Sequence, residues 1–255
     1  MKSITSVNFI YGNLGYADEY TQELLKLLQA YQTHYPEPTA AIAQQSEAMD
    51  LDFMAKDLSK LIESMKEGAR RIRQIVLALR TFSRLDEAEV KSINIHDGID
   101  STLVILGSRL KPKLNYPKIQ ILRNYGSLPL VECYPGPLNQ VFMNILSNAI
   151  DAIEIALKHG QQITPTISID TGLIDETWIQ IRIRDNGNGI PEAIKQKIFD
   201  PFFTTKPIGS GTGMGLAICY QIITDRHQGT LSCSSQSGEG TEFVIQIPLT
   251  QKLRR

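Results

Sequence analysis

Two series of regularly spaced, mostly apolar residues run through the first third of the chain. Both repeat at steps of three or four, the period of helices that pack along their length. The first comprises Ile10, Leu14, Ala17, Thr21, Leu24, Leu28 and Tyr31, and the second comprises Leu58, Leu61, Met65, Ala69, Ile72, Val76, Leu79 and Phe82. We therefore predict two long helices, the first ending before Pro36 and the second beginning after Asp50 or Asp52.

These two helices are expected to form an antiparallel hairpin with a narrow apolar stripe on each helix. A hairpin alone would leave much of that stripe in water, whereas a second copy would bury it in a four-helix bundle. We therefore expect a homodimer through the hairpin. The connection over residues 35–50 is longer than most helix–helix connections and has room for a short helix of its own.

The acidic segment Asp86–Glu89 precedes a change of period, and we place a domain boundary there. Residues 1–88 would form the helical domain, 89–250 a second domain and 251–255 a short tail. In the second domain, helices are predicted at 96–110, 138–157 and 214–224, and strands at 93–95, 118–122, 166–171, 178–184, 230–233 and 242–247. Because strands and helices mix without strict alternation, we predict an α+β chain: a helical hairpin followed by an α/β sandwich with a mixed sheet.

The charge balance argues against a polyanionic partner. The chain has 26 basic and 27 acidic residues and a net charge of -1, so it has no overall field to hold nucleic acid. Cys133, Cys219 and Cys233 are widely spaced and contain no C-x-x-C pair, which fits reduced thiols. No apolar run approaches the roughly 18 residues of a membrane span. We therefore expect a cytoplasmic location.

Two patches of the second domain combine glycine or amide residues with polar chemistry. Asn144 and Asn148 are four residues apart, on one face of a predicted helix, and amide oxygens suit Mg2+. Asp185 ends a predicted strand and precedes Gly187 and Gly189. Its carboxylate could accept a hydrogen bond from an exocyclic amine such as that of adenine. Taken alone, each patch is better explained without a ligand, the two amides by a solvated helix face and Asp185 by a plain turn.

Two further patches are rich in glycine. Gly209–Leu216 leads into a predicted helix, where free N–H groups and the helix dipole favour phosphate oxygens. It lacks the Gly-Lys-Ser/Thr of a Walker A loop and does not follow a first strand, so it is not a dinucleotide fingerprint either. Gly238–Thr241 precedes the last predicted strand and would, alone, be a hairpin turn.

The order of the patches is more specific than any one of them. The series is Asn144-x-x-x-Asn148-Ala149, Asp185-x-Gly187-x-Gly189-Ile190, Phe199-Asp200-Pro201-Phe202-Phe203, Gly211-Thr212-Gly213-Met214-Gly215-Leu216 and Gly238-x-Gly240-Thr241. It closely resembles the N, G1, F, G2 and G3 boxes of the sensor histidine kinases of two-component systems, which belong to the gyrase, heat-shock chaperone, histidine kinase and mismatch-repair ATPase superfamily. The hairpin looks like that family's dimerisation domain.

The resemblance implies a protein-histidine kinase that binds ATP and Mg2+ and transfers the γ-phosphoryl group to a histidine, for relay to the receiver domain of a response regulator. It implies a nucleotide site made of Asn144, Asn148, Asp185, Gly187, Gly189, Ile190, Lys206, Gly211, Thr212, Gly213, Met214, Gly215, Leu216 and Thr241. Asn148 would coordinate the metal, Asn144 would support the metal or triphosphate, and Asp185 would hold the adenine amino group. Lys206 would contact the phosphates, and Ile190 to Gly213 would be a mobile lid anchored by Phe199, Phe202 and Phe203.

Asn144 distinguishes between branches of the superfamily. Its ATP-hydrolysing members resemble one another in having a Glu, the base that activates water, four residues before the metal-binding Asn. An amide cannot take up a proton, so phosphoryl transfer to a protein nucleophile fits this chain better than hydrolysis. A dimeric scaffold that binds nucleotide without catalysis, and an ATPase of the same superfamily, are the alternatives.

The phosphoacceptor of the family lies in the first hairpin helix, in a motif like His-Glu-Ile-x-Asn-Pro. Residues 7–14 resemble the helix segment just after that motif, but residues 1–6 do not match the motif itself. We therefore assign no catalytic histidine among the residues given. Either the acceptor lies just before residue 1, or the chain is a degenerate kinase whose remaining activity is transfer in trans to a histidine-bearing partner. His34, His96 and His159 lie at predicted helix ends, and His227 is expected at the surface.

Overall fold

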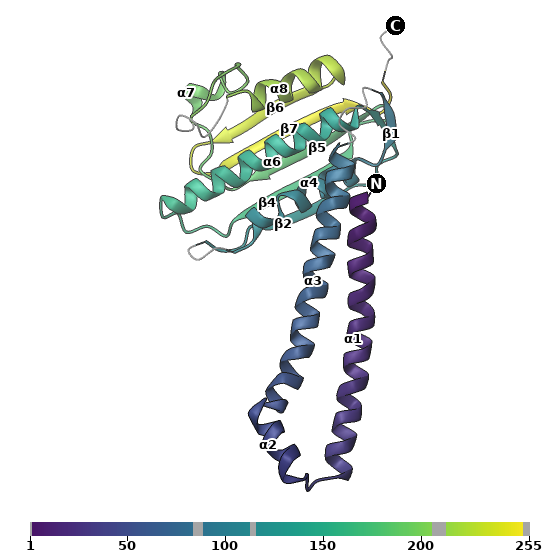
Figure 1. Ribbon diagram of the computed structural model, residues 1–255. Coiled ribbons are helices and arrows are strands. Elements are labelled where there is room, and N and C mark those ends of the chain that lie inside the picture. The colour runs from purple at the N-terminus through teal and green to yellow at the C-terminus, as the bar shows by residue number, and fades with distance from the viewer. Residues whose placement is uncertain (1, 84–88, 113–115, 206–212, 252–255) are drawn as a thin grey trace. The chain divides into compact units, whose positions relative to one another are not determined.

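The computed structural model describes residues 2–83, 89–112, 116–205 and 213–251 (Figure 1). The chain separates into two compact units, Met1–Leu77 and Ala78–Arg255. The boundary predicted between residues 88 and 89 adjoins residues 84–88, which lie outside the described ranges, and it stays a prediction.

The first unit is the predicted pair of long helices. Helix α1 (Lys2–His34) ends before Pro36, α2 (Ala40–Ala48) occupies the long connection, and α3 (Leu51–Ser83) continues into the second unit. Asp50 is the residue that caps α3, because its Oδ1 accepts a hydrogen bond from the backbone N of Phe53 at 3.3 Å.

Side chains between α1 and α3 fix the antiparallel register of the hairpin. Ile62 and Ala69 of α3 are buried. Lys66 Nζ lies 2.7 Å from Asp18 Oδ2, and Gln22 Nε2 donates to Ser59 Oγ at 3.4 Å. The described hairpin is thus joined by a narrow apolar contact with polar pairs beside it.

The second unit is built on a five-stranded sheet with the order β2-β4-β5-β7-β6. The strands are β2 (Gln120–Tyr125), β4 (Thr166–Leu173), β5 (Trp178–Asp185), β6 (Thr230–Gln236) and β7 (Gly240–Pro248). Strand β2 is parallel to β4, and every other pairing in this sheet is antiparallel. The predicted mixed sheet is therefore confirmed. A separate antiparallel pair joins β1 (Lys91–Ile93) and β3 (Val131–Cys133).

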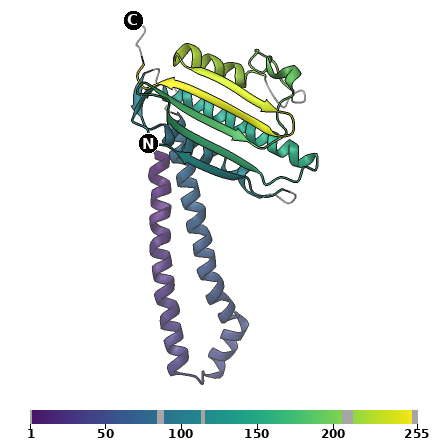
Figure 2. The same ribbon diagram turned by 180° about the vertical axis from the view of Figure 1, so that it is seen from behind.

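One face of the sheet is covered by helices, and Figure 2 shows the opposite face, which no described helix covers. The remaining helical segments are α4 (Ile95–Ile105), α5 (Gly107–Leu110), α6 (Pro135–Lys158), α7 (Glu192–Lys195), α8 (Gly215–Gln221) and the π-helical turn η2 (Ile222–Arg226). Alternate strand positions are buried toward the helices, namely Ile167, Ile169, Ile179, Ile181, Ile183, Ile245 and Ile247. This alternation is the pattern that predicted the strands.

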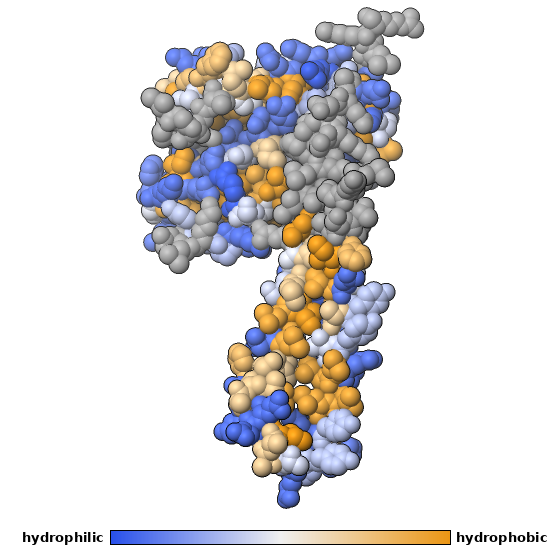
Figure 3. Space-filling view, in the orientation of Figure 1, coloured by the Kyte–Doolittle hydropathy of each residue, from blue (hydrophilic) through white to orange (hydrophobic). Residues whose placement is uncertain are grey.

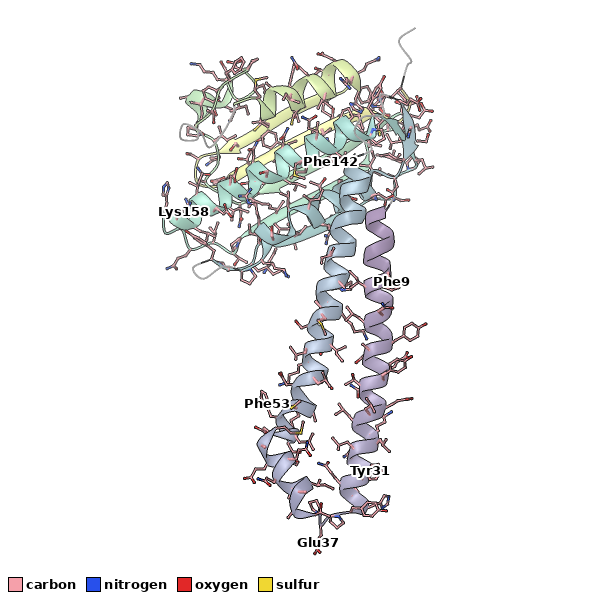
Figure 4. All side chains as sticks on the ribbon, in the orientation of Figure 1. Phe9, Tyr31, Glu37, Phe53, Phe142 and Lys158 are labelled. Atoms are coloured by element: carbon pink, nitrogen blue, oxygen red, sulfur yellow. The ribbon has the colours of Figure 1, made fainter. Side chains whose placement is uncertain are left out.

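Helix α6 is the central helix of this core. Leu138, Phe142 and Ile145 are fully buried (Phe142 is labelled in Figure 4). Among the described helices, α6 alone has the length and hydropathy that a membrane span would need. Its packing against the sheet accounts for that apolar character.

Five local features differ from the prediction. In place of the strand predicted at 93–95, β1 spans Lys91–Ile93, and Ile95 already begins α4. The helix predicted at 96–110 is divided at Leu106 into α4 and α5, and the helix predicted at 214–224 becomes η2 from Ile222. The short elements β3 and α7 were not predicted. Strand β3 and helix α7 have too few residues to show a hydrophobic period.

The prediction that His227 lies at the surface is wrong. Its side chain is fully buried, and the backbone N of Tyr134 donates to its Nε2 at 3.1 Å. Its Nδ1 therefore carries the proton, and lies 2.9 Å from the carbonyl O of Ile222. Burial lowers the pKa of His227, so it serves as a neutral link between η2 and the start of α6.

Candidate functional site

Helix α6 carries both predicted amide residues. Asn144 and Asn148 are half-buried and one turn apart, so they share a face. Asn144 Nδ2 donates to the carbonyl O of Gly215 at 3.2 Å and lies 3.6 Å from Cys219 Sγ. Both partners belong to α8. The Asn144 amide therefore holds α8 against α6, a role that the sequence did not indicate.

Asp185 is buried at the end of β5, opposite Thr241 of β7. Only 3% of the residue is exposed, and one carboxylate oxygen accepts the backbone N–H of Gly187 at 2.8 Å. Burial raises the pKa of Asp185 to about 6, although the amides of Gly187 and Thr241 and the charge of Arg184 oppose that shift. A buried acceptor of this kind is suited to a ligand that brings its own N–H donor.

Two glycines after Asp185 allow backbone to come very close. A Cβ at Gly187 would lie 2.6 Å from the carbonyl carbon of Ala152 in α6. Gly189 has a φ of +67°, and a Cβ there would lie 2.0 Å from the carbonyl O of Gln236. The loop after β5 therefore packs directly on α6 and β6, which places Asp185 beside the helix that carries the amides.

Ser235 joins the loop after β5 to the last two strands. Its Oγ accepts the backbone N–H of Ile190 at 2.8 Å and donates to the carbonyl O of Gly240 at 2.8 Å. The hydroxyl of Thr241, 3.0 Å away, is therefore the donor in its contact with Ser235. No pattern in the sequence marked Ser235, which lies among polar residues of an edge strand.

The segment predicted to form the lid is packed at two of its three phenylalanines. Phe199 and Phe203 pack against the core, and the Phe199 ring lies 5.4 Å from that of Tyr220. Phe202 is 76% exposed and has a φ of 67°, so it does not anchor the segment as expected.

The end of the glycine-rich patch leads into α8. Gly213 and Met214 directly precede the helix, Gly215 begins it, and Leu216 packs against the core. Lys206, Gly211 and Thr212 lie outside the described residues, so their predicted contacts with phosphate stay predictions.

These contacts connect the elements that carry the described candidate residues. Asn144 joins α6 to α8, Gly187 brings the loop after β5 onto α6, and Thr241 lies opposite Asp185. In the described part of the chain, no three His, Cys, Asp or Glu side chains converge on a metal position. The arrangement can present a buried carboxylate to an amine donor and amide groups to a more polar part of the same ligand.

Comparisons with known proteins agree with this geometry. Residues 134–251 match the family described as histidine kinase-, DNA gyrase B- and HSP90-like ATPase. The catalytic domain of the histidine kinase ThkA superposes with a TM-score of 0.53 at 30% identity, over 64% of this chain and 99% of that domain. The chain therefore belongs to this ATPase family. Its second unit is a histidine kinase ATP-binding domain.

Two curated relatives agree with this assignment. The signal transduction histidine-protein kinase AtoS of Escherichia coli K12 is 34% identical over 179 residues, 70% of this chain and 27% of that protein. The sensory histidine kinase/phosphatase NtrB of Rhodobacter capsulatus is 30% identical over 220 residues, 84% of this chain and 59% of that protein. The chain thus spans between about a quarter and three fifths of the length of these two relatives.

Proposed function

We propose that this chain is the Mg-ATP-binding core of a two-component sensor histidine kinase. A histidine ring nitrogen would attack the γ-phosphorus, the bond to the bridging oxygen of ADP would break, and the phosphoryl group would pass on to an aspartate of a receiver domain. The observation that carries the proposal is the buried Asp185 carboxylate, which accepts hydrogen bonds from the amides of Gly187 and Thr241 and is followed by a loop that packs on α6. Adenine supplies the amine donor that such a carboxylate lacks.

Mg2+ fits the donor set if the nucleotide supplies most of the ligands. Asn148 offers an amide oxygen, and hard cations in nucleotide sites are commonly held by one or two protein oxygens plus phosphates and water. The absence of a three-residue metal cluster among the described residues agrees with this division. Asn144, whose amide N–H groups face α8, would act on the metal only indirectly.

The proposed acceptor is a histidine of a partner chain. His227 is fully buried with both ring nitrogens in contact with backbone. His96 stacks on Tyr125 with ring centroids 4.2 Å apart, and its Nε2 lies 2.9 Å from Thr171 Oγ1. His34 and His159 end helices α1 and α6. His96 and His227 are held by local contacts, and His34 and His159 occupy helix ends, so the proposal assigns the acceptor to none of these four histidines.

A homodimer through the hairpin is part of the proposal. Large apolar side chains of α1 and α3 are exposed beside the contact that joins the two helices: Phe9, Tyr16, Tyr20, Leu24, Leu27 and Tyr31 on α1, and Met54, Leu58, Leu61, Met65 and Ile72 on α3. Figure 3 shows apolar residues of both helices on one face of the hairpin, and Figure 4 labels Phe9 and Tyr31 toward the two ends of α1. A second hairpin would bury this face.

We also propose a cytoplasmic location, because all three cysteines are free thiols in the structure.

The deciding experiment uses ATP labelled on its γ-phosphoryl group. The full chain is incubated with Mg2+ and labelled ATP, with and without a partner protein that carries an intact acceptor helix and with the same partner lacking its histidine. Acid-labile label on the intact partner alone is the expected result. Label that stays on ATP, despite measurable nucleotide binding, would favour the non-catalytic scaffold. Steady release of inorganic phosphate at the rate of a true hydrolase would favour an ATPase.

A further inference from the structure

Helix α6 carries a carboxylate on the same face as its two amides. Asp151 follows Asn144 by seven residues, which is within about 20° of two full turns. It is also three residues beyond Asn148, so the two are neighbours on the helix surface. The face proposed to meet the phosphates of ATP therefore includes a negative charge, which by itself would repel them.

Arg109 of α5 forms an ion pair with the Asp151 carboxylate. Its Nη2 lies 2.5 Å from Asp151 Oδ1 and 2.8 Å from Glu154 Oε2, and its Nη1 donates to Ser147 Oγ at 3.1 Å. All three partners lie on α6. The guanidinium is therefore fixed along one side of that helix, on the flank next to the amide face.

Arg109, Asp151 and Glu154 are partly buried, so water screens the interactions between their charges less than it would at the surface. The side chains of Arg109, Asp151 and Glu154 are 30%, 24% and 23% exposed. Burial alone would lower the pKa of Arg109, but the hydrogen bonds to the two carboxylates outweigh it and the pKa is raised. Helix α5 provides a firm base, since Leu110 packs on the core and its carbonyl O accepts the backbone N–H of Ile119.

We propose that Arg109 is a positioning residue for the triphosphate: it draws Asp151 toward α5 and neutralises it, so that the amide face of α6 can receive phosphate oxygens. The proposal rests on the ATP-binding function proposed above. Without the guanidinium, the net charge beside the phosphates would become more negative by one. The Coulomb cost to a ligand rises with its charge, so ATP would suffer more than ADP.

The test measures the affinity of the full chain for ATP and for ADP, in excess Mg2+, by titration calorimetry. Arg109→Met is expected to weaken ATP binding about tenfold and ADP binding about threefold. Arg109→Lys, which keeps the charge, is expected to lose less. Adding Asp151→Asn to Arg109→Met should restore ATP affinity to within about twofold, whereas adding Glu154→Gln should restore less, because Glu154 lies further from the amide face.

Arg123→Met is the matched control. Arg123 forms an ion pair with Asp100 between β2 and α4, its Nε lying 3.0 Å from Oδ1, and the two side chains are 47% and 49% exposed. Its loss should leave both affinities unchanged. A purely structural role for Arg109 would lower ATP and ADP affinity by the same factor and would not be reversed by Asp151→Asn; either result overturns the inference alone. If the unmodified chain binds no nucleotide, the proposed function and this inference fall together.

Discussion

Asp185 is a residue at which binding and stability oppose each other. Burial raises its pKa from 3.8 to about 6. Between those two values the native chain holds a proton that the unfolded chain has released. Stability therefore decreases as the pH rises from about 4 to 6, and the full cost of the buried charge is present above about pH 6. A ligand that donates a hydrogen bond to the carboxylate would offset that cost.

Replacing Asp185 by Asn should therefore separate the two effects. Asp185→Asn removes the charge but keeps an oxygen for the Gly187 N–H, so the ligand-free protein should gain about 1–3 kcal/mol of unfolding free energy at pH 7. The gain should vanish below about pH 4. The same variant should lose ATP affinity, because the amide would present its NH2 group to the amino group of adenine. Urea unfolding across pH and calorimetric titration measure the two changes.

Asp170→Asn is the control for that variant. Asp170 lies on β4, where Asn124 Nδ2 donates to its Oδ1, and its replacement should change neither stability nor ATP affinity appreciably. Equal ATP affinity in Asp185→Asn and the unmodified chain would refute the proposed role of Asp185 in holding adenine.

Individual site residues could be predicted from the sequence where their neighbours in the chain form a recognisable pattern. Asp185 ends an alternating strand and precedes two glycines, so the sequence identified it as a candidate site residue. Ser235 and His227 were not identified in this way, because their partners Ile190 and Tyr134 lie 45 and 93 residues away. A polar residue among polar neighbours shows no sign of such distant contacts until the fold brings them together.

The secondary structure elements were predictable where a period repeats several times. The two long helices and the strands β4, β5 and β7 have enough turns or alternations to establish their pattern. Strand β3 has three residues and forms a two-stranded sheet with the equally short β1. The contact that makes it a strand is between segments about 40 residues apart, which single-sequence periodicity does not detect.

The close packing of Gly187, in the loop after β5, against helix α6 can be tested by substitution. Gly187→Ala would place a methyl carbon 2.6 Å from the backbone of Ala152, so the loop would have to move away from α6. We expect a loss of about 1–3 kcal/mol of unfolding free energy, together with weaker ATP binding because Asp185 moves with the loop. Gly172→Ala in β4, where a Cβ meets nothing within 4 Å, should change neither. If the two variants behave alike in urea unfolding and in ATP titration, close packing at Gly187 is not what places Asp185.

At the scale of the whole molecule, the hairpin leaves many large apolar side chains of α1 and α3 exposed to water. In α3, Ile62 and Ala69 are buried against α1, whereas Leu61 and Met65 next to them are 52% and 50% exposed. The heptad-like spacing predicted an apolar stripe that one hairpin would leave largely in water, and among the described residues Leu61 and Met65 of that stripe are exposed. Dimerisation therefore stays a prediction.

Leu61→Glu tests whether a second copy covers that stripe. A carboxylate in the centre of an apolar four-helix contact would be buried without a partner, so the dimer dissociation constant should rise at least about tenfold. Helix content should be retained, because Leu61 is exposed within one chain. Lys56→Glu is the matched control: Lys56 is exposed about 140° around α3 from Leu61, and it changes the charge by more. Sedimentation velocity over a concentration series should show a monomer shift for Leu61→Glu alone. Equal dissociation in both variants would mean that the exposed stripe is not the dimer interface.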